Sequence, residues 1–79
     1  MPSPSKHPVI WEGVVVGEVD DISCDNFNVF GRWYPANTDA TAKFYEQLRH
    51  GRELRISVGS LEGIIDTPPD AWVEMTASS

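Results

Sequence analysis

A chain of 79 residues with 41% hydrophobic and 23% charged side chains has the composition of one small folded domain, which excludes a disordered acidic tail. Its single cysteine excludes an intrachain disulfide, no apolar run could span a membrane, and the N-terminal MPSPSKHP lacks the apolar segment of a signal peptide, so we expect a cytoplasmic protein. The net charge of −6 disfavours non-specific binding to nucleic acid or to an anionic membrane, because such binding neutralises negative charge.

The two ends of the chain differ in composition from its middle. MPSPSKHP holds three prolines in eight residues, and the terminal TASS is small and polar. Neither stretch buries enough apolar surface to offset the entropy of ordering it. We therefore expect a disordered tail over residues 1–8, a single domain over residues 9–76 and a short tail over residues 77–79.

The first expected element is one long strand over residues 9–20, VIWEGVVVGEVD, because its side chains alternate with a period of two. Its expected inward residues are Trp11, Val15 and Val19. Gly13 and Gly17 share that face, where a missing side chain permits either a bend or a bulky residue of a neighbouring strand. Trp33 is the candidate for that residue.

The stretch DDISCDN, residues 20–26, is rich in residues that favour turns, and it predicts a solvated turn. A calcium loop is not expected, because Ile22 and Cys24 interrupt the carboxylates where oxygen ligands are needed. A zinc site would need about four nitrogen or sulfur ligands, and the chain holds one cysteine and two histidines. Cys24 lacks an evident base to activate it. We expect no metal and no cofactor.

FNVFGRWY, residues 27–34, alternates again and predicts a second strand that Pro35 ends. One face is expected to carry Phe27, Val29 and Trp33, and the other Phe30, Arg32 and Tyr34. A helix is predicted within residues 37–51, with Asn37 or Thr38 capping its first turn and Gly51 ending it. Its apolar stripe is Ala40, Phe44 and Leu48.

Two further strands, ELRISV and LEGIID, flank Gly59-Ser60, a pair suited to a two-residue hairpin turn. That turn predicts the pairs Val58–Leu61, Ile56–Gly63 and Leu54–Ile65 on one face, and Arg55–Ile64 and Ser57–Glu62 on the other. After a second turn in DTPPD, the run AWVEM predicts a last strand with Ala71, Val73 and Met75 on one face and Trp72 and Glu74 on the opposite one.

These elements predict an α+β domain: a five-stranded, mostly antiparallel sheet or open barrel with one helix, in the order β-β-α-β-β-β. One helix covers one face only, yet the apolar residues Phe30, Tyr34, Ile64 and Trp72 point to the other. Scattered rim positions, or a register misread by one residue, are the plain interpretation. The alternative is a contact patch for a protein partner or a second copy of the chain.

No residue set suggests catalysis, since there is no phosphate-binding glycine loop and no nucleophile with a base. We therefore predict a non-catalytic protein-interaction module, most simply a homodimer.

The alternative function joins Arg32, Arg52 and Arg55 with Tyr34, Trp33 or Trp72 as a stacking surface for single-stranded nucleic acid. Cations near the end of the helix have a simpler explanation, since they complement its dipole. Five strands and a helix resemble an oligonucleotide-binding barrel in inventory. In that family the helix lies between the third and fourth strands, whereas here it is expected after the second, so the family is not assigned.

Overall fold

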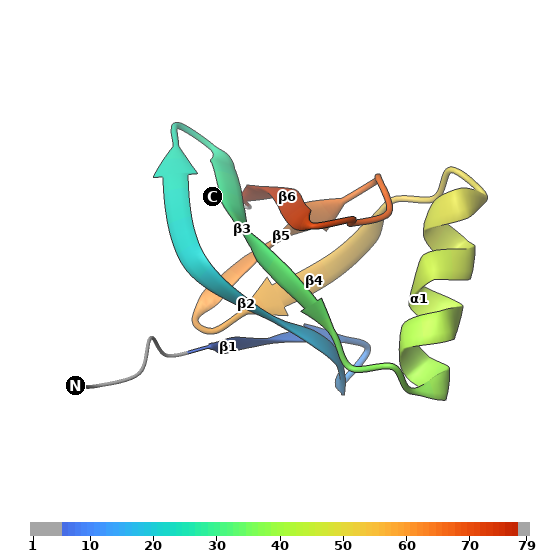
Figure 1. Ribbon diagram of the computed structural model, residues 1–79. Helices are drawn as coiled ribbons and strands as arrows, with labels where there is room; N and C mark the ends of the chain where they lie inside the picture. The colour runs from blue at the N-terminus through green and yellow to red at the C-terminus, as the bar shows by residue number, and fades with distance from the viewer. Residues whose placement is uncertain (1–5, 78–79) are drawn as a thin grey trace.

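The computed structural model describes residues 6–77, which form a barrel of six antiparallel strands with one helix (Figure 1). The elements are β1 (His7–Trp11), β2 (Val14–Asp25), β3 (Asn28–Pro35), α1 (Asp39–Arg49), β4 (Leu54–Val58), β5 (Leu61–Ile65) and β6 (Trp72–Ala77). Around the barrel the order is β1-β2-β3-β6-β5-β4, and β4 pairs with β1 to close it. The α+β class and the single helix are as predicted, but the sheet has a sixth strand and no open seam.

The ends of the folded unit differ slightly from those expected. Strand β1 begins at His7, inside the segment expected as a tail, and β6 continues to Ala77. Lys6, in the same segment, is described as well, whereas residues 1–5 and 78–79 of the predicted tails lie outside the described residues.

The sixth strand arises because the expected long strand is a hairpin. Glu12 and Gly13 have φ angles of 53° and 78°, and Trp11 pairs with Val14 across them. Two successive positive φ angles are the requirement of a tight two-residue hairpin turn. The prediction of an unbroken strand is wrong. It places Gly13 within the strand, whereas the positive φ of Gly13 forms the turn between β1 and β2.

The hairpin also changes which side chains face inward. Val19 is buried as predicted, and Val9 and Val16 are buried too, whereas Val15, expected inside, is 44% exposed. A register shift between Val9 and Ile10 accounts for part of the difference, because such a shift exchanges the two faces of a strand.

The acidic stretch is part of β2 rather than a turn. β2 continues to Asp25, and the chain reverses at Asn26 and Phe27 instead. An irregularity between Asp20 and Ser23, with φ of 52° at Asp21, bends the strand there. The prediction of a turn over the whole stretch is wrong because its turn-favouring residues are accommodated in this bulge and in the hairpin end.

The hydrophobic core fills the inside of the barrel. Its buried members are Val9, Val16, Val19, Val29, Trp33, Phe44, Leu48, Leu54, Ile56, Val58, Ile65, Val73 and Met75. The predicted packing of Trp33 over Gly17 is confirmed, since a Cβ on Gly17 would come closer than 3.0 Å to the indole ring. Phe27, expected on the inner face, lies instead in the β2–β3 turn and is 66% exposed.

Helix α1 stands across one end of the barrel (Figure 1). Phe44 is fully buried there, with its ring centroid 5.8 Å from that of Trp11 and 6.0 Å from that of Trp33. The Thr38 hydroxyl caps the helix by accepting from the Thr41 amide. Gly51 follows the helix with φ of 77°. These features confirm the predicted helix and show that it seals the core.

The β4–β5 hairpin has the predicted register at every pair, with Gly59 at a φ of 60° in its turn. In β6 the predicted alternation also holds: Val73 and Met75 are buried, whereas Trp72 and Glu74 point outward. The predicted strand began one residue early, at Ala71.

Candidate binding surface

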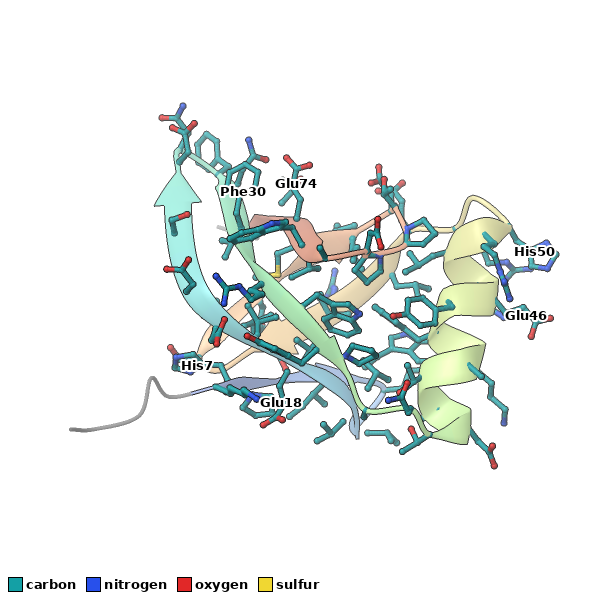
Figure 2. All side chains as sticks on the ribbon, viewed as in Figure 1. His7, Glu18, Phe30, Glu46, His50 and Glu74 are labelled. Carbon is teal, nitrogen blue, oxygen red and sulfur yellow. The ribbon has the colours of Figure 1, made fainter. Side chains whose placement is uncertain are left out.

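The outward side chains of β3 and β6 form the surface that we call the outer face: Phe30, Arg32, Tyr34, Trp72 and Glu74. Phe30 pairs directly with Glu74, and Arg32 pairs with Trp72. Directly opposed side chains of antiparallel strands have Cβ atoms about 4.5–5.5 Å apart, so these pairs are in contact range. Figure 2 shows Phe30 and Glu74 at the same end of the strand pair, far from the helix.

Arg32 covers part of Trp72. The guanidinium carbon lies 5.7 Å from the centroid of the indole ring, within range of a cation–π contact. The phenolic group of Tyr34, followed by the charge of Asp20, raises the pKa of Arg32 above its ordinary value. The guanidinium therefore stays protonated at any working pH, and it keeps a positive charge on one side of Trp72.

Tyr34 is tied to the barrel by its neighbours. Its hydroxyl donates to Oδ2 of Asp20 over 3.0 Å, and Nζ of Lys6 lies 4.2 Å from the centre of its ring. Asp20 is only 7% exposed, and its other carboxylate oxygen has no partner within residues 6–77. The ring of Tyr34 is thus occupied by contacts of its own chain, which makes it the least available aromatic residue of the outer face.

A shallow groove of about 270 Å³ lies beside Trp72. Its lining residues are Phe30, Thr67, Pro68, Pro69, Trp72, Val73 and Glu74. One wall is the β5–β6 loop with its two prolines, and the other comes from the outward residues of β3 and β6. Trp72 is 52% exposed, so half of a large apolar ring remains in contact with solvent here.

Ile64, the fourth residue of the predicted patch, does not adjoin this groove. It lies on β5, paired with Thr76 of β6 and with Arg55 of β4. Thr76 is four residues beyond Trp72, which corresponds to about 13 Å along an extended strand. Phe30 and Trp72 are therefore together, Tyr34 is nearby on the same face, and Ile64 is separate.

The predicted basic set is also dispersed. Arg32 lies on β3, Arg52 follows the helix, and Arg55 is on β4. Three strand spacings, about 14 Å, separate β4 from β3 around the barrel. The charges of Asp20 and Asp21 reduce the local positive charge further, since Asp20 is the register partner of Arg32 across β2 and β3 and both carboxylates act on the guanidinium.

Within residues 6–77 no three histidine, cysteine, aspartate or glutamate side chains gather closely enough to hold a metal ion. Cys24 is exposed on β2. In that same part of the chain, no helix has the length and apolar character needed to cross a bilayer. The outer face is therefore the candidate site, because it combines a half-exposed tryptophan, a cation over its ring and a groove beside it.

Comparison with protein-family models, with curated proteins and with solved structures found no match to this chain.

The groove wall formed by the β5–β6 loop was not predicted from the sequence. The signal for it is the order of residues in DTPPDAW, where a proline pair comes just before an outward tryptophan. We interpreted the prolines as a turn only. Which strand the loop lies against depends on how the barrel closes, and that is not visible in the local pattern.

Proposed function

We propose that this protein is a non-catalytic protein-interaction module that binds its partner through the outer face of β3 and β6. The observation that carries the proposal is the position of Trp72, half exposed beside Phe30 in a groove. Tryptophan is enriched among the residues that dominate binding energy at protein interfaces. The core is complete without this ring, since Trp33 and Phe44 already fill the barrel and its end.

The face is tested with a photo-crosslinking amino acid placed at position 67, which lines the groove without replacing Trp72, and, as a matched control, at position 14. Val14 is also exposed and apolar, but it lies at the β1–β2 turn beside the helix. We expect covalent adducts with a polypeptide, either a second copy or another protein, from position 67 only. Equal labelling from both positions, or none, would contradict the proposal.

Self-association is the form of the proposal predicted from the sequence. It predicts a mass that rises with concentration from 8.8 kDa towards twice that value in light scattering after size-exclusion chromatography. Trp72→Ser is expected to keep the mass at that of the monomer, whereas Val14→Ser is not. A wild-type mass that stays at 8.8 kDa at millimolar concentration would remove the self-associating form and leave a different partner.

A second candidate is binding of single-stranded nucleic acid, which one specific observation favours. Because the expected first strand is a hairpin, α1 lies between the third and fourth strands, where oligonucleotide-binding barrels have their helix. The outer face also combines aromatic rings with Arg32. This candidate predicts salt-sensitive binding of a single-stranded oligonucleotide that Arg32→Glu abolishes and Arg55→Glu weakens. Absence of binding at low salt would exclude it.

A further inference from the structure

We infer that the groove beside Trp72 binds an extended polypeptide segment that carries proline next to a basic residue. This inference rests on the proposed protein-binding function and names the chemistry of the partner. The size, the ring-lined walls and the charge of the groove each support it.

The first argument is size. A standard interface between folded proteins buries about 800 Å² on each partner, which is a large fraction of a surface of 5303 Å². Among the exposed apolar residues, Val14 and Val15 lie by the β1–β2 turn and Ile64 lies on β5, so these three do not extend the surface around Trp72. The groove of about 270 Å³ is also below the range of about 300–1,000 Å³ typical of small-molecule pockets. A few residues of an extended chain fit its dimensions.

The second argument is the shape of the walls. Phe30 and Trp72 provide flat rings, and Pro68 and Pro69 provide a rigid opposite side. Proline-rich segments dock in aromatic-lined grooves because their extended helix is already formed and loses little entropy on binding. Such segments also present unpaired backbone carbonyls. The indole N–H of Trp72 is not used by any hydrogen bond among the described residues, so it is available as a donor to one of them.

The third argument is charge. Glu74 lines the groove, and the loop that forms its wall also contains Asp66 and Asp70. The neighbouring cation, Arg32, lies over Trp72, and the negative charge of Asp20, its register partner on β2, is close enough to raise its pKa. With a net charge of −6, the protein attracts a cationic segment and repels an anionic one. A lysine or arginine beside the proline therefore complements the groove.

The test uses an acetylated ten-residue peptide of proline with one central arginine, and indole N–H resonances of the ¹⁵N-labelled full chain. The signal of Trp72 is expected to shift on titration, whereas that of Trp33, which donates to the Tyr45 hydroxyl, is expected to stay fixed. A peptide with glutamate in place of arginine is expected to bind about tenfold more weakly, because it faces Glu74. Replacing the prolines by alanine is expected to weaken binding to a similar extent.

Matched variants locate the contact. Glu74→Gln is expected to weaken binding of the arginine peptide about three- to tenfold, whereas Glu46→Gln, on the distant face of the helix, is expected to leave it unchanged (Figure 2). Phe30→Ala is expected to weaken it at least tenfold. Leu61→Ala, an exposed apolar residue of β5, is the control for loss of apolar surface.

The outcomes separate this inference from the function on which it rests. If no peptide shifts the Trp72 signal at millimolar concentration while crosslinks at position 67 persist, the inference is overturned and the protein-interaction function stands. If those crosslinks do not exceed the control at position 14, the function itself is overturned. Equal binding of the arginine and glutamate peptides overturns the inference that the partner segment is basic. A shift of the Trp72 signal caused only by a single-stranded oligonucleotide assigns the outer face to nucleic acid.

Discussion

The inner and outer faces of the β3–β6 pair contain the same kinds of residue in opposite situations. Trp33 points inward, is 5% exposed and donates its indole N–H to the Tyr45 hydroxyl over 2.7 Å. Trp72 points outward, is 52% exposed and lies under the guanidinium of Arg32. The first has its apolar surface and its polar atom satisfied within the fold. The second has about half of its surface in solvent, and its indole N–H makes no hydrogen bond among the described residues, which is why we propose binding for the outer face.

The largest effect that tests this comparison is expected for Trp33→Ala. Removing a buried tryptophan costs about 3–5 kcal/mol in the free energy of unfolding, through lost burial and a residual cavity. The total stability of a domain of this size is about 4–12 kcal/mol, so this one substitution is expected to remove a large fraction of it. Urea denaturation followed by circular dichroism measures the change. A loss below about 1 kcal/mol would show that the inner face does not hold the fold.

Gly17→Ala sharpens the comparison by filling the space that Trp33 occupies. A Cβ at this position would overlap three carbons of the indole ring, and overpacking of a core costs about 1–3 kcal/mol. If the clash is with this ring, the same substitution is expected to cost much less in a Trp33→Leu background, which a double-mutant cycle measures. An equal cost in both backgrounds would assign the effect to the backbone instead.

Thr41→Val tests the attachment of the helix to the barrel. The Thr41 hydroxyl is buried and donates to the Val16 carbonyl over 2.8 Å, and the Ala36 amide donates to the same oxygen. Because that oxygen keeps one donor, the substitution is expected to cost about 1 kcal/mol in unfolding free energy. Thr67→Val is the control, since its hydroxyl bonds to Asp66 at an exposed site. A similar loss in both variants would contradict a specific role for the buried bond.

The elements that could be predicted from the sequence were those with strong local signals. Gly59-Ser60 determines the register of β4 and β5 because a two-residue turn permits a single pairing. Thr38 and Gly51 set the ends of the helix through their own backbone and side-chain geometry. The alternation in β3 and β6 predicted the inward position of Trp33 and the outward position of Trp72. Such alternation depends only on neighbouring residues of one strand, so it can be recognised without knowing how the strands pair.

Features that depend on long-range closure could not be predicted. Nothing in the pattern around Glu12 and Gly13 distinguishes a turn from a gap in a strand, and that choice decides the number of strands and the place of the helix. The alternation of side chains assigns Ile64 and Trp72 to the same side of a flat sheet. On a closed barrel, two outward side chains can lie far apart around the circumference or along the strands. The groove needs both Phe30 and the β5–β6 loop, and only the pairing of β3 with β6 brings them together.

The smallest change in stability is expected for Trp72→Ala, and it is the most informative one. Because the ring is half exposed and outside the core, we expect the free energy of unfolding to change by about 0.5 kcal/mol or less in urea denaturation. Binding at the outer face is expected to be lost in the same variant. Trp33→Ala gives the reverse contrast, since it acts through unfolding. If Trp72→Ala destabilised the protein as much as Trp33→Ala, the exposed tryptophan would be part of the structural core, and the division between the two faces would fail.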